Sequence, residues 1–298
     1  MLLDESGKRL ILLHHCRGIG WKGIYQILQR DCQLMSIFKY DIQDWKTILP
    51  RTPLPKLSLF FNDLHSINID KQMTQYKLNN IKICSYFDKE YPNRLKHIYN
   101  PPWVLYMKGN FQLMHERKIL SVIGTRNPTN YGESAIKRIL PRLVENEYVI
   151  VSGLAAGIDT YAHQAAMKGK GKTIAVLGGG LFQIYPKENV PLALQMMKEH
   201  LVISETPPFQ KPEPWMFPLR NRIISGISDG ALVIEAKEKS GSLITAYQAL
   251  EQGKEVFALP GNITSPSSVG TNQLIQEGAK LVLTFQDIDR ELAHNFLK

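Results

Sequence analysis

Short runs of β-branched and other apolar residues recur from about residue 81 onward. Each run ends in glycine or a small polar residue before a stretch of helical periodicity. The runs occupy 118–124, 148–153, 173–180, 201–205, 231–236, 255–261 and 280–283, and helices are predicted near 131–146, 155–168, 189–199, 242–252 and 270–277. Strands that alternate with helices of this length are typical of βαβ units. The pattern predicts an α/β fold with an extended Rossmann-like, mostly parallel sheet and helices on both faces.

Residues 1–80 lack these glycine-terminated strands and show apolar residues at helical spacing instead, interrupted by Pro50, Pro53 and Pro55. We therefore expect two domains, a small all-helical one over 1–80 and the α/β domain over 81–298. Within the first, Arg17-Gly18-Ile19-Gly20 is a hairpin-like turn whose backbone N–H groups could face a phosphate.

The charge balance favours a polyanionic partner. The formal net charge is +9 and the isoelectric point about 9.3, which alone does not separate nucleic acid, anionic membrane and simple solubility. Cys16, Cys32 and Cys84 have no metal-ligand spacing and indicate reduced thiols. The N-terminus has an acidic pair where a secretory signal would be basic, and no apolar run could span a bilayer. We expect a cytoplasmic protein without metal, cofactor or membrane partner.

The loops after the strands carry the chemistry, because right-handed crossovers bring them to the carboxyl edge of the sheet, where open α/β sheets bind ligands. Gly124-Thr125-Arg126 offers a close backbone approach, a hydroxyl and a guanidinium for a phosphate, although a plain turn with a solvated arginine is the alternative. The small residues of 152–157 permit an anion nest, with Asp159 as a helix cap. Gly178-Gly179-Gly180 permits approach of a phosphate or of another backbone, and Lys187 follows it.

The segment 217–226 places an aromatic residue beside two arginines and an asparagine, the combination that single-strand binding requires. We expect that Arg220 and Arg222 do not both face inward; the alternative is that Phe217 is core and that the arginines pair with Glu205, Glu213 or Glu235. Ser240, Ser242 and Thr245 form a further anion-compatible helix start, or Ser240 is simply an N-cap. Neither a P-loop nor a dinucleotide fingerprint is present, so a polyphosphate spread along the edge fits better than one small cofactor.

The motifs at 121–132, 150–166, 173–189, 203–208, 217–228, 235–246 and 259–279 resemble, in order and spacing, those of the DNA-processing protein A family (DprA, also called Smf). The resemblance covers about 200 residues, and 86–110 resembles the family's lead-in. It implies a protein without catalytic activity that binds and protects single-stranded DNA in natural transformation and recombination. It also implies loading of the RecA recombinase, displacement of single-strand-binding protein, and action as a homodimer.

Residue by residue, the loops and the resemblance together assign single-stranded DNA contacts to Gly124, Thr125, Arg126, Ser152, Gly153, Gly179, Lys187, Phe217, Arg220, Asn221 and Arg222. The resemblance also assigns self-association to Leu274, Ile275 and Leu281, where burial in the core is the alternative. The helical block 1–80 resembles the SAM-like or helix–hairpin–helix-like domain of many members. The rival hypothesis is a nucleotide phosphoribohydrolase-like enzyme, but Ala246 and Tyr247 stand where its catalytic glutamate would be wanted.

Overall fold

The computed structural model describes residues 5–296, and the chain packs as two compact units. The first unit holds the residues through Tyr91 together with Asn100–Tyr106, and the second holds Pro92–Tyr99 and everything from Met107 onward. Residues 81–91 and 100–106 thus pack with the helical block. The predicted division into folding domains at residue 80 stays a prediction.

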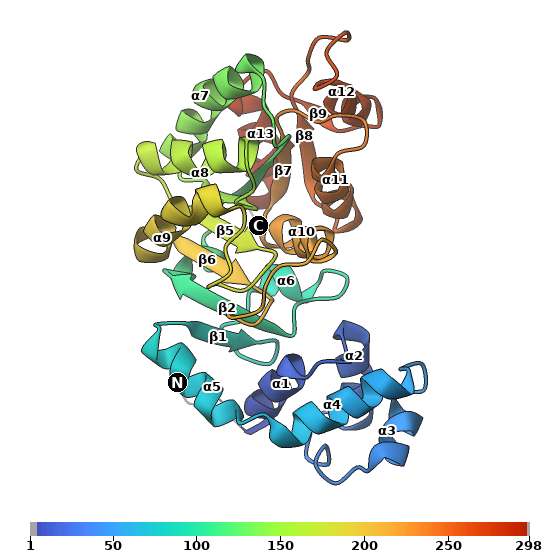
Figure 1. Ribbon diagram of the computed structural model, residues 1–298. Coiled ribbons are helices and arrows are strands. Elements are labelled where there is room, and N and C mark those ends of the chain that lie inside the picture. The colour runs from blue at the N-terminus through green and yellow to red at the C-terminus, as the bar shows by residue number, and fades with distance from the viewer. Residues whose placement is uncertain (1–4, 297–298) are drawn as a thin grey trace. The chain divides into compact units, whose positions relative to one another are not determined.

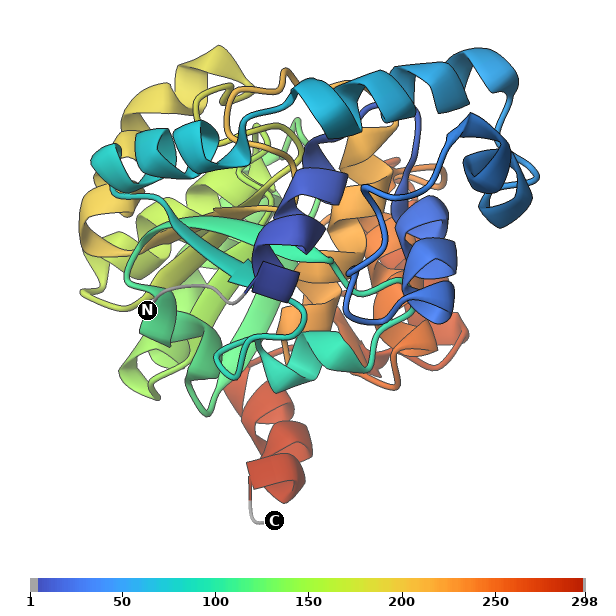
Figure 2. The ribbon, with the colours of Figure 1, turned by 90° about the horizontal axis from the view of Figure 1, so that it is seen from below.

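The first unit is mainly helical and appears in blue and cyan in Figure 1 and Figure 2. Leu10, Ile11, Leu13, Trp45 and Phe60 are buried in its core. Its elements are α1 (Glu5–His15), α2 (Trp21–Arg30), α3 (Ile42–Ile48), α4 (Leu54–Ser66), α5 (Ile69–Leu78) and β1 (Lys82–Ser85).

The hairpin-like turn between α1 and α2 is tied to α4. The backbone N–H of Arg17 donates to Asp63 Oδ2 over 2.8 Å, and the Arg17 guanidinium donates to both oxygens of the same carboxylate. These bonds from Arg17 lower the pKa of Asp63. The first N–H of the turn is therefore occupied by the protein itself, which leaves less of the turn for a phosphate.

The second unit contains the glycine-bearing loops. Its elements are α6 (Asn93–Lys96), the end of β2 (Val104–Gly109), the 3₁₀ helix η1 (Phe111–His115), β3 (Ile119–Ile123), α7 (Asn130–Glu145), β4 (Val149–Ser152), α8 (Ile158–Lys168), β5 (Thr173–Leu177), the 3₁₀ helix η2 (Lys187–Asn189), α9 (Val190–Glu199), β6 (Leu201–Ser204), α10 (Met216–Ile227), β7 (Gly230–Val233), α11 (Gly241–Glu251), β8 (Glu255–Ala258), α12 (Val269–Gln276), β9 (Lys280–Leu281) and α13 (Phe285–Phe296).

The strands of this unit run in the order β2-β6-β5-β4-β3-β7-β8-β9. In this order, every neighbouring pair from β6 to β9 is parallel. Helices α7 and α8 pack with α13 on one face of the sheet, and α10 and α11 pack together on the other (Figure 1). The predicted fold class is therefore confirmed, including the helical region that precedes the sheet.

The strand order reverses at β3. The chain proceeds from β3 through β4 and β5 to β6 in one direction, then returns and adds β7, β8 and β9 on the other side. The loops after β3 and β7 consequently leave the carboxyl edge in opposite directions and open a crevice between them. This switch point is where open α/β sheets bind their ligands.

One buried histidine in the core makes the stability of the fold depend on pH in the acid range. His163 on α8 is completely buried, and its Nδ1 lies 2.7 Å from Thr173 Oγ1. Since that hydroxyl donates to the carbonyl of Ile150, Nδ1 must be the donor. Burial lowers the pKa of His163 to about 3.

We expect His163 to make the protein less stable in acid. An unfolded histidine takes up a proton near pH 6.5, whereas the folded one resists it until about pH 3. The free energy of unfolding therefore falls as the pH drops through that window and is unaffected by His163 above it. His163→Asn keeps a donor for Thr173 and removes the titration, so urea unfolding at graded pH should show a shallower acid slope. Gln164→Asn, at an exposed neighbouring position, should keep the wild-type slope, and equal slopes in all three proteins would contradict this role.

Candidate nucleic-acid interface

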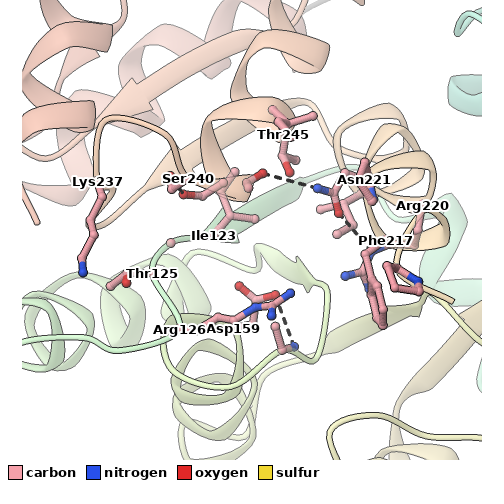
Figure 3. Close-up of a pocket in the computed structure, with 18 of the residues that line it drawn as sticks. Ile123, Thr125, Arg126, Asp159, Phe217, Arg220, Asn221, Lys237, Ser240 and Thr245 are labelled. Atoms are coloured by element: carbon pink, nitrogen blue, oxygen red, sulfur yellow. Dashed lines mark hydrogen bonds between the residues drawn. The ribbon is translucent and has the colours of Figure 1, made fainter. Parts of the chain in front are cut away.

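A pocket of about 700 Å³ opens at the switch point between β3 and β7 (Figure 3). It is bounded by the loops after β3, β4, β5, β6 and β7 and by the first turns of α10 and α11. Its lining comprises Ile123, Gly124, Thr125, Arg126, Ala155, Asp159, Tyr185, Pro212, Pro214, Phe217, Pro218, Arg220, Asn221, Ile224, Lys237, Lys239, Ser240, Gly241, Ser242, Ile244 and Thr245. Of the predicted DNA contacts, the structure brings six together here: Gly124, Thr125, Arg126, Phe217, Arg220 and Asn221.

The Gly-Thr-Arg loop is held from two sides. The N–H of Thr125 donates to the carbonyl of Glu235 over 2.8 Å, and the N–H of Ile158 donates to the carbonyl of Thr125 over 3.1 Å. Gly157 packs so closely, at φ +78°, that a Cβ there would lie 2.5 Å from the carbonyl oxygens of Thr125 and Arg126. The backbone of the loop is thus fixed, while the Arg126 side chain remains exposed at the pocket.

Glu235 extends this clasp from the end of β7. Its buried carboxylate accepts hydrogen bonds from the N–H of Thr129 at 2.9 Å and from the Thr129 hydroxyl at 2.6 Å. Thr129 is in turn the N-cap of α7, with its side chain accepting from Tyr131 N. Glu235 therefore joins the loop after β3 to the end of β7 and is not available as a partner for the arginines of α10.

Arg220 braces the floor of the pocket. Arg220 is 7% exposed. Its guanidinium donates to the carbonyl of Gly153, which follows β4, and to the carbonyl of Val176 in β5. Asp159 accepts from the N–H groups of Gly153 and Ala155, so it holds the loop after β4. The expectation that Asp159 caps the helix was wrong, because Asp159 lies within α8 and the N-cap residue is Gly157. Burial raises the pKa of Asp159 against the opposing charge of Arg220, and burial lowers the pKa of Arg220 to about 10. Arg220 consequently stays cationic at neutral pH.

Arg222 lies in the interior, where we expected a DNA contact. Its side chain is 6% exposed and pairs with Glu205 over 2.8 Å, and it also donates to the carbonyl of Leu219. It is not among the described residues that line the pocket. The expectation that Arg220 and Arg222 do not both face inward was wrong. Residues two apart on a helix point in nearly opposite directions, but α10 is covered by protein on both of these sides, and each arginine has its own buried partners.

The predicted glycine and serine contacts shape the site from beneath. Ser152 is buried and donates to the carbonyl of Val122, while both backbone polar groups of Gly153 are used by Asp159 and Arg220. A Cβ on Gly179 would meet the ring of Pro212 at 2.8 Å. Of the two alternatives for the triple glycine, the structure therefore shows close approach of another protein segment.

Lys187 is exposed in η2, just after Tyr185, which lines the pocket. Phe217 also lines the pocket, and it is neither fully buried, as a core residue would be, nor fully exposed. Its ring is partly exposed, 5.7 Å from the ring of Tyr185 between centroids. The Asn221 side chain accepts from Arg220 Nε and donates to the carbonyl of Gly241 over 3.4 Å, linking α10 to the start of α11.

Sequence reasoning missed Lys237 and Lys239. Both are exposed and line the pocket opposite α10, and Figure 3 shows Lys237, Arg126 and Phe217 on three separate segments around it. The available signal was their position immediately after the strand at 231–236, which brings them to the same edge as Arg126.

The residues assigned to self-association differ in exposure. Leu274 is 1% exposed and belongs to the core, Ile275 is partly exposed, and Leu281 on the terminal strand β9 is 45% exposed. Within residues 5–296 no cluster of potential ligands could hold a metal ion. Over the same range, no helix is both long and apolar enough to cross a membrane.

Comparison with known proteins places this arrangement in a family. Residues 82–293 match the family model described as DNA recombination-mediator protein A. The DNA processing protein DprA of Bacillus subtilis is 48% identical over 224 residues, which is 75% of each chain. The crystal structure of DNA processing protein A from Streptococcus pneumoniae is 37% identical, with a TM-score of 0.83 over 98% of this chain and 99% of that one.

A structure of DNA processing protein A from Helicobacter pylori, described for its single-stranded DNA binding mode, is 29% identical. It aligns with a TM-score of 0.65 over 72% of this chain and 96% of that one. The resemblance inferred from the motifs is confirmed, since the matched region contains every loop of the pocket. The chain belongs to the DNA recombination-mediator protein A family, the DprA/Smf proteins.

Proposed function

We propose that this protein binds single-stranded DNA at the switch-point pocket. The observation that carries the proposal is the ring of exposed cations, Arg126, Lys237 and Lys239, around a pocket that also contains the partly exposed ring of Phe217. Cations that follow the phosphates, with an aromatic face for a base, are the combination used for single strands. The Helicobacter pylori relative, described as binding single-stranded DNA, supports this proposal.

The side chains around the pocket differ in the contacts that they can make with a DNA strand. Arg126 can hold a phosphate through two parallel hydrogen bonds, whereas Lys237, Lys239 and Lys187 act as mobile point charges along the backbone. Phe217 and Tyr185 offer apolar faces to a base. Because stacking and phosphate contacts are alike for every base, binding should depend little on sequence.

Binding without catalysis fits the pocket better than hydrolysis does. Asp159 is the one carboxyl group among the described lining residues, and it already accepts hydrogen bonds from two backbone N–H groups. Ala246 is buried, and the hydroxyl of Tyr247 donates to Glu277, away from the lining residues. A phosphoribohydrolase-like reaction would therefore lack its carboxylate at these positions.

The family supports a wider proposal in which the protein acts in the cytoplasm during natural transformation. There it would protect incoming strands, load RecA onto them as single-strand-binding protein is displaced, and act as a homodimer. The exposed side of β9, with Leu281 and the partly exposed Ile275 nearby, is the surface that we propose for self-association. Leu274 would support that surface from within the core.

Arg126→Ala should weaken binding of oligo(dT) by about 1–3 kcal/mol without changing the thermal midpoint, because the side chain is exposed while its backbone is held by other residues. Titration at several salt concentrations should also show the slope of log K against log salt reduced by about 0.7, the value for one lost phosphate contact. Arg138→Ala, an exposed arginine on α7, is the matched control. Unchanged affinity in Arg126→Ala would remove the pocket as the binding site.

Arg222→Ala should act on stability. It leaves Glu205 without its partner in a largely buried setting, which costs about 3–5 kcal/mol when a buried ion pair is broken. Chemical unfolding measures the loss, and the double variant Arg222→Met with Glu205→Gln should recover part of it because no unpaired charge remains. A variant Arg222→Ala with normal stability and weakened DNA binding would restore Arg222 as a direct contact.

Leu281→Asp should convert a dimer into monomers, because the charge would enter an apolar surface of the terminal strand. Size-exclusion chromatography with light scattering gives the mass directly. Leu194→Asp, at an exposed apolar position on α9, should leave the dimer intact. A monomeric wild-type protein, or a dimer unaffected by Leu281→Asp, would refute this surface.

A further inference from the structure

A second aromatic pair lies outside the pocket, on the loops after β5 and β6. The ring centroids of Phe182 and Phe209 are 4.9 Å apart at an angle of 32°. Phe209 is 50% exposed and Phe182 is partly exposed. Neither residue is among the described residues that line the pocket, so DNA binding at the pocket alone does not involve them.

The pair is built into the backbone. The N–H of Gly180 donates to the carbonyl of Gln210 over 2.9 Å, and the N–H of Phe182 donates to the carbonyl of Pro208 over 3.0 Å. These two bonds bracket Phe209 and hold the two loops side by side. Ser204 and Thr206 add hydroxyl bonds to the carbonyls of Gly179 and Gly178. The backbone that carries the two aromatic rings is therefore fixed by these hydrogen bonds.

Positive charge accompanies the pair. The Nζ of Lys108 lies 5.9 Å from the centroid of the Phe182 ring, within the range of a cation–π contact. Lys211 is exposed two residues after Phe209. A stacking face beside lysines matches a nucleobase with its phosphates.

The pair is also continuous with the pocket. Pro212, which packs against Gly179, lines the pocket, and so does Tyr185, three residues after Phe182. Three extended residues span at most about 11 Å, so both aromatic pairs are within reach of one strand. The loops after β5 and β6 thus carry one aromatic pair at the pocket, Tyr185 with Phe217, and one beyond it.

We propose that Phe182, Phe209 and Lys108 form an outer subsite that stacks a further base of the strand held in the pocket. The inference rests on the proposed DNA-binding function and extends it. A strand too short to leave the pocket does not reach this subsite, whereas a longer one gains a stacked base and a phosphate contact there. The subsite therefore makes affinity depend on strand length.

Fluorescence anisotropy with a thymidine dinucleotide, which is too short to occupy both aromatic pairs, and with oligo(dT) of about 16 nucleotides, the upper end of the sites covered by single-strand-binding modules, tests the subsite. Phe209→Leu keeps the apolar bulk and removes the aromatic face. It should weaken binding of the longer strand roughly 5- to 150-fold, the change for one lost stacking contact, and leave the shorter strand unaffected. Phe209→Trp should restore wild-type affinity, and Leu194→Ala is the control for an exposed apolar side chain.

The outcomes separate the two proposals. Arg126→Ala should weaken both strands, and its failure to do so would overturn the pocket itself. If Arg126→Ala weakens both while Phe209→Leu matches the wild type at both lengths, the pocket stands and the outer subsite is refuted. Equal weakening of both strands by Phe209→Leu would also refute it, because the residue would then act on the pocket and not beyond it. Melting curves for each variant establish that the fold is kept.

Discussion

The site depends on the clasp between the ends of β3 and β7. The hydrogen bond from Thr125 N to the carbonyl of Glu235, together with the Glu235 carboxylate on Thr129, joins the two loops that diverge at the switch point. A buried carboxylate is tolerated there because it accepts strong hydrogen bonds in place of water. Without the clasp, Arg126 and the lysines after β7 would belong to independent loops, and their charges would not share one ligand.

The glycines of the loops allow other segments of the protein to pack closely against them. Gly124 leaves room for Ile158, Gly178 for the ring of Phe217, and Gly179 for Pro212, each at distances that a Cβ would make impossible. Close packing of neighbouring loops is what concentrates the exposed cations around a single opening. A glycine-rich loop in a sequence therefore indicates a crowded edge, and the charged side chains beside it show what that edge can bind.

The fold was predictable because its signal is repeated. Each strand and helix of the α/β region is short, but the alternation over many units leaves few other architectures, and the loop at Arg126 follows directly from it. Burial at single positions was not predictable in the same way. Arg222 and Arg126 look alike in the sequence. Pairing of Arg222 with Glu205 was one of several alternatives that the sequence left open, and the structure shows that pair, with Arg222 in the interior. Lys237 and Lys239 were missed because exposed lysines are common and their value comes from the edge on which they lie.

The bracing by Arg220 has a thermodynamic consequence. Its guanidinium ties the loop after β4 to strand β5 and lies over Asp159 before any ligand arrives. The backbone of these walls is therefore ordered in the free protein, and it adds little to the conformational entropy lost when a ligand binds. In the proposed complex that loss falls on the exposed lysine side chains and on the nucleic acid, which would pass from a flexible coil to a held conformation. Tighter complexes would then be reached by restricting the nucleic acid beforehand, since stiffening the backbone of the protein has little left to gain.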